Sequence, residues 1–322
     1  MIIRKLGKVF DPADHTLPDN CREFAQSPQA LEFEDFTRVY FCTRSVDPDG
    51  KTFRSHVSFA DMEKDFSSVR RVAPKTVLPA GDLGTFDEHG VFPINVIRNE
   101  GQVWGYTCGW NRRVSVAVDT AVGLVVSDDD GETFRRIGPG PILGPSLHEP
   151  FLVGDAFVIR AMGVFHMWYM FGQRWKREND TSQPDRVYKI GHAVSQDGIG
   201  WTKEDGVQIL PDRLGSDECQ ALPSVLHFGE RYHMVFCYRD VHGFRTDPGK
   251  GYRIGYAQSD DLVTWNRDDA ALGFETEPGA WDAEMQCYPH LTLSSGEPYL
   301  LYNGNAFGRY GFGAAKLSLP EC

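Results

Sequence analysis

The stretch Ser195-Gln196-Asp197-Gly198-Ile199-Gly200-Trp201 is one copy of a phrase that recurs along the chain. Its core is a Ser-x-Asp turn followed by an aromatic residue, and related copies begin at Ser127 and Ser259, with a degenerate copy at Ser58. A second marker repeats in step with the first, at intervals of 65, 63, 67 and 66 residues: Pro28, Pro93, Ala156, Pro223 and Pro289. A steady period of this length indicates repeated supersecondary units that pack against one another.

The composition agrees with units built from short strands. Each marker is followed by an apolar, aromatic-rich run, such as His166-Met167-Trp168-Tyr169. The 322 residues include 33 Gly and 19 Pro, which separate strand-like runs. Five such units predict an all-β chain with one domain over residues 1–322, a five-bladed β-propeller of four-stranded antiparallel blades. The fifth unit has no outer strand of its own, so we expect the N-terminal run Ile2 to Phe10 to close the ring.

The recurring Ser-x-Asp turn is interpreted as structural. A Ser or Asp side chain in such a turn accepts hydrogen bonds from nearby backbone amides, and Gly supplies a positive φ angle. The aromatic residue that follows is expected to pack between blades.

The charge balance argues against two classes of partner. The net charge of -12 disfavours nucleic acids and anionic membranes, because both are bound through basic patches. No apolar stretch reaches the roughly 18 residues that a transmembrane helix needs. The first residues show no secretory signal.

The cysteines indicate a reducing compartment. Their number is odd, none forms a CxxC pair, and most lie in strand-like runs: Cys21, Cys42, Cys108, Cys219, Cys237, Cys287 and Cys322. We interpret them as buried thiols of a cytoplasmic protein without a disulfide framework. No cluster has the ligand spacing of a zinc site, and no cofactor is expected.

Carboxylates recur in phase with the repeat. Four glutamates stand five residues before their prolines: Glu23, Glu88, Glu218 and Glu284. In the third unit Glu149 stands seven residues before Ala156, and Asp155 directly precedes it. Like charges near one another raise some pKa values, and glycoside hydrolysis needs one protonated and one ionised carboxyl group. The alternative is that each acid caps a loop or pairs with an arginine.

Three segments resemble a known group of enzymes. Leu147-His148-Glu149-Pro150-Phe151-Leu152, Asp155-Ala156-Phe157-Val158-Ile159-Arg160 and His166-Met167-Trp168-Tyr169 are similar to segments of the five-bladed propeller glycosidases. This superfamily comprises glycoside hydrolase families 43, 32, 68 and 130 and their bacterial glycosidase-like relatives. The resemblance implies an Asp base or nucleophile in the first blade, an Asp that orients and tunes, and a Glu general acid.

The family's roles transfer only in part. Asp155 resembles the Asp of the family's Asp-Pro-x-Val element, and Glu218 resembles the general acid of the next blade. The first blade departs, because Ser27 stands where the family shows Asp, leaving Glu23 or Asp19 as the nearest substitute. We therefore expect Glu218 as the acid, Asp155 as the orienting carboxylate, and Glu88 or Glu23 as the base, with Glu149 as a further candidate.

A second group of side chains suits a polar funnel of sugar size. Aromatic faces can stack on a pyranose or a nucleobase, histidines lie beside the acids, and arginine or asparagine side chains can donate to hydroxyls or to phosphate. The candidate binding residues are His89, Trp110, His148, Arg160, Trp175, Arg239, Glu284, His290 and Asn303. The alternative is that each histidine is structural and each basic residue is a solvated loop charge. Whether an ion occupies the central channel, as in some relatives, is left open.

The leading hypothesis is a cytoplasmic enzyme that cleaves a glycosidic bond of a small carbohydrate or sugar-nucleotide substrate with paired carboxylates. Inversion is favoured over retention by family analogy alone. A glycoside phosphorylase or transferase is the alternative among enzymes. The missing first-blade Asp motivates a third reading, a non-catalytic carbohydrate-binding propeller.

Overall fold

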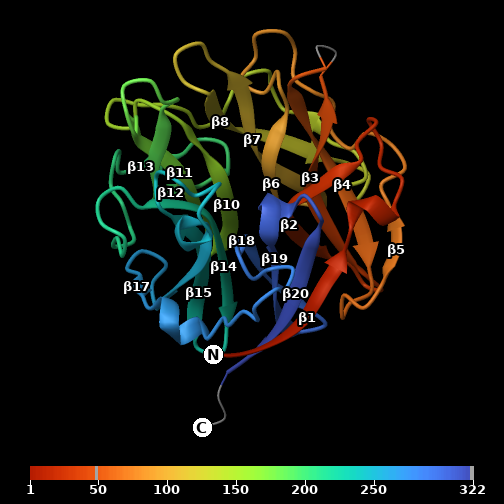
Figure 1. Ribbon diagram of the computed structural model, residues 1–322. Helices are drawn as coiled ribbons and strands as arrows, with labels where there is room; N and C mark the ends of the chain where they lie inside the picture. Colours follow the sequence, from red (N-terminus) through yellow and green to blue (C-terminus); the bar gives the residue numbers. More distant parts are fainter. Residues whose placement is uncertain (48–49, 320–322) are drawn as a thin grey trace. The chain divides into compact units, whose positions relative to one another are not determined.

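The computed structural model describes residues 1–47 and 50–319. Its strands form five four-stranded antiparallel sheets, so the fold is the expected five-bladed β-propeller (Figure 1). The helices of the described residues are short 3-10 segments, at Pro12–Asp14, Pro248–Lys250, Asp269–Leu272 and Asn305–Gly308. None of the described helices is long and apolar enough to cross a membrane.

Four of the sheets follow the chain order. The first contains β2 to β5, at Glu23–Glu32, Thr37–Val46, Phe53–Met62 and Val69–Val72. The second contains β6 to β9, at Val91–Asn99, Gln102–Arg112, Val118–Ser127 and Arg135–Arg136. The third contains β10 to β13, at Val153–Ala161, Val164–Lys176, Asp185–Ser195 and Thr202–Lys203. The fourth contains β14 to β17, at Cys219–Phe228, Arg231–Arg239, Arg253–Ser259 and Asn266–Arg267.

The fifth sheet joins the two ends of the chain, in the order β1-β20-β19-β18. Its strands span Ile2–Phe10, Phe312–Ser318, Glu297–Asn303 and Cys287–Ser294. β1 pairs antiparallel with β20, from Ile2 opposite Ser318 to Phe10 opposite Phe312. The prediction that the N-terminal run supplies the missing outer strand is confirmed.

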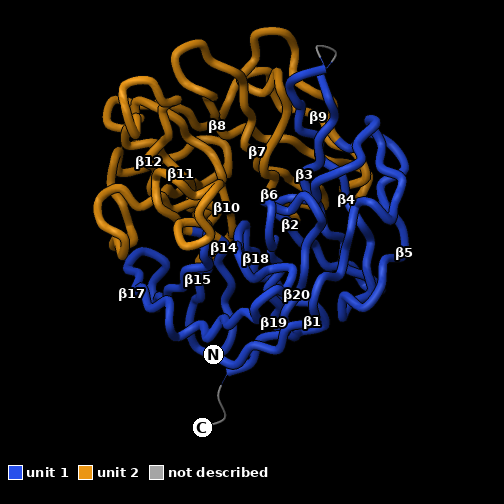
Figure 2. Tube along the Cα trace, viewed as in Figure 1, with its two compact units in different colours: residues 1–77, 224–237, 252–322 blue, residues 78–223, 238–251 orange. Residues whose placement is uncertain are grey.

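The chain divides into two compact units (Figure 2). Unit 1 holds residues 1–77, 224–237 and 252–322, and unit 2 holds residues 78–223 and 238–251. One core of unit 1 surrounds Phe10, Phe41 and Phe312, whereas a core of unit 2 surrounds Tyr106, Met167 and Phe171. The prediction of a single domain over the whole chain stays a prediction.

The repeated marker, which is Pro in four units and Ala in the third, coincides with an unusual backbone conformation. The residue before it has a positive φ in four of the five units: Ser27 (53°), Asp155 (51°), Leu222 (52°) and Tyr288 (56°). In the second unit the Phe92-Pro93 peptide bond is cis instead. The strand ladder is irregular at this point, for example between Gly154 and Phe157 of β10. Because a bulge re-aims the side chains of its strand, these positions differ from ordinary strand residues.

The Ser-x-Asp turns are structural, as interpreted. Ser195 Oγ accepts a hydrogen bond from the backbone N–H of Gly198 at 2.9 Å, and Asp197 Oδ1 accepts from Ile199 and Gly200 at 2.8 Å each. In the later copy, backbone N–H groups that donate to Asp261 lower the pKa of this carboxyl to about 2. These carboxylates hold their own loops.

Six cysteines are buried free thiols: Cys21, Cys42, Cys108, Cys219, Cys237 and Cys287. Burial raises the pKa of Cys21 to about 12, which keeps this thiol neutral. Cys322 lies outside the described residues.

Candidate active site

Asp155 is a buried carboxyl group at the start of the inner strand β10. Only 8% of the residue is exposed, and its positive φ places it in the irregular part of the strand. Burial raises its pKa to about 7, against the opposing effects of the Arg186 charge and of a hydrogen bond with Cys108. An acid with this pKa exchanges a proton readily near neutral pH, which is what general acid–base catalysis requires.

Arg186 is the nearby positive charge, and it lies on β12 directly opposite Trp175 of β11. The pairing of opposite residues puts the guanidinium and the indole on the same face of the sheet. Arg186 is half-buried, and among the described residues its side chain makes no hydrogen bond or ion pair. It is therefore available to a polar or anionic ligand beside Asp155.

The second blade contributes further residues around Asp155. Cys108 of β7 hydrogen-bonds with Asp155, and a Cβ atom at Gly154 would collide with its sulfur, so glycine permits the close approach of β10. Trp110, two residues further along β7, faces the same side of the strand as Cys108. The ring of His89 packs on that of Trp110 with centroids 5.5 Å apart. Within unit 2, Trp110 and His89 thus connect to Asp155 through Cys108, and Trp175 connects to it through Arg186.

Glu149 is buried in a different environment. Its carboxylate forms an ion pair with Lys203, accepts from the Tyr169 hydroxyl at 2.8 Å and accepts from the Gly206 backbone N–H at 3.0 Å. None of the glutamate is exposed, and the Lys203 side chain is 9% exposed. These contacts favour a structural role for Glu149.

Glu218 is also fully buried, directly before β14. Its Oε2 accepts from the backbone N–H groups of Arg213 and Leu214, at 2.7 and 2.9 Å, and its Oε1 accepts from Gln220 Nε2 at 2.8 Å. Oε2 therefore holds the loop that begins at Arg213, and Oε1 is held by a side chain of β14. The acid role predicted for Glu218 stays a prediction, and these contacts favour loop support.

The remaining predicted residues of unit 2 are spread along its strands. Glu88 accepts from the Gly84 backbone N–H at 3.0 Å and directly precedes His89. His148 is exposed. Arg160 lies five residues beyond Asp155 on β10, where it packs on the Phe165 ring, so about 16 Å of strand separates the two. Arg239 is 1% exposed and donates to the Tyr188 hydroxyl and to backbone carbonyl groups.

The predicted residues of unit 1 serve mainly structural contacts. Glu23 is exposed and forms a two-point ion pair with Arg309, and Glu284 is exposed. His290 accepts from the Ala30 backbone N–H and lies 3.3 Å from Ser224 Oγ, while burial lowers its pKa to about 3. Asn303 donates to two backbone carbonyl groups and accepts from the Ser27 backbone N–H.

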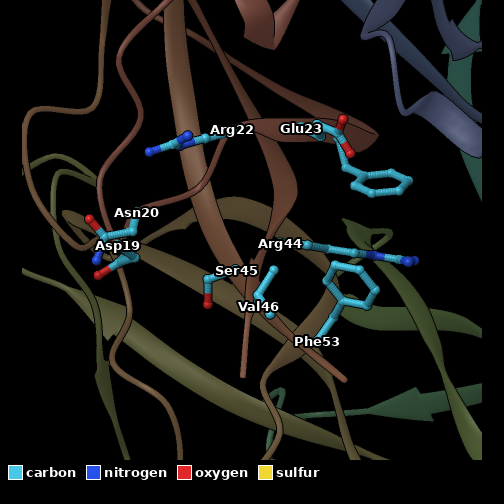
Figure 3. A pocket seen from close by; sticks show the side chains of 9 residues that line it. Asp19, Asn20, Arg22, Glu23, Arg44, Ser45, Val46 and Phe53 are labelled. Atoms are coloured by element: carbon cyan, nitrogen blue, oxygen red, sulfur yellow. The ribbon is translucent and has the colours of Figure 1, made fainter. Parts of the chain in front are cut away.

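Unit 1 also contains a pocket of about 470 Å³ that Glu23 lines (Figure 3). The other lining residues are Asp19, Asn20, Arg22, Phe24, Arg44, Ser45, Val46 and Phe53. Both first-blade carboxylates that the sequence offered in place of the family's Asp, Glu23 and Asp19, line this pocket.

The sequence pattern did not indicate Arg186 or Cys108 as partners of Asp155. Arg186 has no counterpart in the repeated phrase, and Cys108 was interpreted as a buried thiol. The alternation Cys108-Gly109-Trp110 could have indicated that the thiol and the indole share a face. The described residues contain no group of three or more His, Cys, Asp or Glu side chains placed to hold a metal ion.

No family model matches the chain. Two sequences from Mycobacterium tuberculosis do match, the uncharacterized protein Rv1502 of strain H37Rv and MT1551 of strain CDC 1551. Each is 31% identical over 320 residues, which cover 98% of this chain and 99% of the relative. The chain belongs to the Rv1502 family. A β-1,2-mannobiose phosphorylase of a Thermoanaerobacter species is 29% identical over 141 residues, covering 40% of this chain and 43% of the relative.

Solved structures confirm the resemblance to propeller glycosidases at the level of the fold. A glycoside hydrolase aligns with a TM-score of 0.70 and 16% identity over 99% of this chain and 94% of its own. A thermostable family-43 glycoside hydrolase aligns with a TM-score of 0.60 and 14% identity over 95% and 94%. The β-1,2-mannobiose phosphorylase of Listeria innocua aligns with a TM-score of 0.65 and 12% identity over 99% and 97%.

Proposed function

We propose that the protein is an enzyme that cleaves a glycosidic bond of a small carbohydrate, with Asp155 as the group that exchanges the proton. The observation that carries this proposal is the buried Asp155 carboxyl, whose pKa is raised to about 7. The propeller relatives named as glycoside hydrolases and phosphorylases support the reaction class.

The proposed chemistry begins with protonated Asp155. It donates its proton to the glycosidic oxygen while the bond from this oxygen to the anomeric carbon breaks. Water attacks the anomeric carbon, and a second carboxylate accepts the proton that water loses. We assign this base role to Glu88, because it adjoins His89, which packs on Trp110.

Substrate recognition is assigned to the groups around Asp155. The indole rings of Trp110 and Trp175 offer apolar faces for the C–H surfaces of a sugar ring. Arg186 supplies N–H donors for hydroxyl groups. Because six buried cysteines are free thiols, we place the reaction in the reducing cytoplasm.

Phosphorolysis is the second candidate reaction, and Arg186 favours it. A half-buried guanidinium without a carboxylate partner among the described residues suits a planar, two-point contact with phosphate. Phosphate would then replace water as the attacking group. The partial similarity to a β-1,2-mannobiose phosphorylase points the same way.

The test is a substrate screen with and without inorganic phosphate, read by proton NMR. The panel contains β-1,2-mannobiose, other disaccharides and sugar nucleotides. Release of free sugar without phosphate supports hydrolysis, and release of a sugar 1-phosphate supports phosphorolysis. The anomer that appears first tests the inverting outcome. Binding detected by calorimetry with no turnover of any compound would contradict the enzyme proposal and favour a carbohydrate-binding propeller.

A further inference from the structure

Unit 1 contains a chain of hydrogen-bonding groups that the proposed function does not use. Ser45 Oγ lies 2.7 Å from His56 Nε2, and His56 Nδ1 lies 3.7 Å from Asp19 Oδ2. Thr76 Oγ1 donates to the other oxygen of Asp19 at 2.5 Å. Asp19 Oδ2 is buried and has no hydrogen-bond partner among the described residues, so the facing imidazole N–H is its available donor.

The fold explains why these residues meet. β3 and β4 form an antiparallel pair in which Thr43 faces His56 and Ser45 faces Arg54. Ser45 and His56 are therefore diagonal neighbours on one face of the hairpin, within reach of each other. Asp19 arrives from the turn before β2, where Asp19 and Asn20 both have positive φ angles, of 60° and 57°.

The imidazole is in a state suited to accept a proton. Burial lowers the pKa of His56, and the Arg54 charge lowers it further, while the Asp19 carboxylate opposes both effects. With the proton on Nδ1 toward Asp19, Nε2 is free to accept from the Ser45 hydroxyl. The 3.7 Å contact is longer than a hydrogen bond, as is common for such pairs before a substrate binds.

Ser45 and Asp19 also line the pocket of about 470 Å³. Figure 3 shows both among its side chains, together with Asn20 and Arg22. A hydroxyl held by a half-buried histidine at the wall of a pocket is the arrangement of an activated nucleophile.

We propose that Ser45, His56 and Asp19 form a second catalytic site, which hydrolyses short-chain carboxylic esters of polar alcohols such as O-acylated sugars. This site shares no residue with the proposed glycosidic site, because its residues belong to unit 1 and those of the glycosidic site belong to unit 2.

The reaction balances with water as the co-reactant. Ser45 Oγ bonds to the ester carbonyl carbon as its proton passes to His56 Nε2. The carbon–oxygen bond to the alcohol breaks, and His56 returns the proton to the departing oxygen, which leaves an acyl-serine. Water then attacks the acyl carbon and gives a proton to His56. The bond to Ser45 breaks, the serine regains the proton, and a carboxylic acid is released.

The pocket lining sets the substrate class. Asn20 and Arg22 carry side-chain N–H donors for the negative oxygen that develops on the carbonyl group. Phe24 and Phe53 add apolar surface, and Glu23 and Arg44 add polar groups. This mixture suits a short acyl group on a hydroxylated alcohol.

The first test needs no variant. The full chain is incubated with a fluorophosphonate that reacts with activated serine, and the modified peptide is identified by mass spectrometry. We expect one equivalent of label on Ser45. Absence of label, or label on another residue, would overturn the proposal.

The second test measures hydrolysis of p-nitrophenyl acetate and of a peracetylated disaccharide. We expect Ser45→Ala and His56→Gln to lower the rate at least about 100-fold. The matched control is Ser55→Ala, because Ser55 precedes His56 on β4 and its side chain faces the other side of the strand. Equal rates for the wild-type chain and the folded Ser45→Ala variant would refute the site. Ser45→Ala should leave the glycosidic activity unchanged, which distinguishes the proposed esterase site from the proposed glycosidic site.

Discussion

Two regions of unit 2 bury carboxylates in opposite ways. The loops before the inner strands hold Glu149 and Glu218, each fully buried and each satisfied by three or more donors. The start of β10 holds Asp155, which is also buried but has Cys108 as its hydrogen-bond partner and Arg186 as a charge nearby. Burial removes the hydration of all three carboxylates, and the protein groups that take the place of water differ between the two regions.

The number of hydrogen-bond donors around a buried carboxylate indicates whether it stabilises a loop or can exchange a proton. A carboxylate that accepts from lysine, hydroxyl or backbone N–H groups keeps its charge and fixes a loop. A carboxyl buried without such donors favours its protonated form, which is why its pKa rises toward 7. We therefore propose the start of β10 as the proton-exchanging region and the preceding loops as its scaffold.

The largest expected effect tests that assignment directly. Asp155→Asn keeps the shape of the side chain but removes its proton exchange, so kcat/KM should fall by roughly 10² to 10⁴. If Asp155 is the acid, the loss should shrink for substrates with good leaving groups, because these need less protonation. The measurement is kcat/KM across a series of aryl glycosides.

The matched control for this series is Asp180→Asn, an exposed position in the loop between β11 and β12. It makes the same chemical change at an exposed residue that is not assigned to catalysis or to substrate binding, and it should retain full activity. A similar loss in both variants, or none in Asp155→Asn, would break the distinction between the two regions.

The repeated phrases determined how much of the fold was predictable. Each Ser-x-Asp turn holds its loop through contacts of two or three residues in sequence, such as those of Asp197, so the local pattern is sufficient to place it. The position before each marker likewise has a special local backbone geometry, either a positive φ or, before Pro93, a cis peptide bond. The closing strand was predictable because the fifth unit lacked one.

The candidate site was less predictable because its contacts are distant in sequence. The partner of Glu149 is Lys203, 54 residues away, and nothing in the repeat singles out that lysine. The pairing of Trp175 with Arg186 depends on a register shift between Gly172 and Arg174. Since one residue of shift exchanges the two faces of a strand, the pattern could not place Arg186 beside Asp155. The acids look equivalent from their spacing to the repeated marker. They differ in the hydrogen-bond donors that residues distant in sequence supply.

The next largest effect concerns the scaffold. Glu149→Gln removes the partner of the nearly buried Lys203, so the free energy of unfolding should fall by about 3 to 5 kcal/mol. Urea unfolding measures it. The double variant Glu149→Gln/Lys203→Met removes the isolated charge as well and should recover part of the loss. Additive losses in the double variant would show that the ion pair is not the cause.

The stability of the protein should also depend on pH through Asp155. The folded chain keeps this proton up to about pH 7, whereas the unfolded chain releases it near the ordinary Asp value of 3.8. The stabilising contribution is therefore complete below the unfolded value and is lost as the pH rises through about 7. The loss is on the order of 4 kcal/mol at most.

This pH effect is measured as the difference in free energy of unfolding between the wild-type chain and Asp155→Asn, from pH 4 to pH 8. Taking the difference removes the contributions of the other titratable groups. We expect the variant to gain stability relative to the wild-type chain as the pH rises. A constant difference would mean that the pKa of Asp155 is not raised by folding and that Asp155 is not the proton-exchanging group.

The smallest loss of stability and activity is expected for Glu218→Gln. This variant is the most direct test of the contrast between the loop carboxylates and Asp155. The Gln side chain has one oxygen where the carboxylate uses two, so one set of N–H donors faces an amide NH₂ group. The free energy of unfolding should fall by about 1 to 3 kcal/mol, while kcat/KM should change far less than in Asp155→Asn. The paired measurement is a urea titration with the same aryl glycoside series. A loss of roughly 10² to 10⁴ in a well-folded Glu218→Gln variant, largest for poor leaving groups, would instead make Glu218 the acid, as its position in the repeat predicts. Asp155 would then be the residue that tunes it, and the two regions would exchange roles.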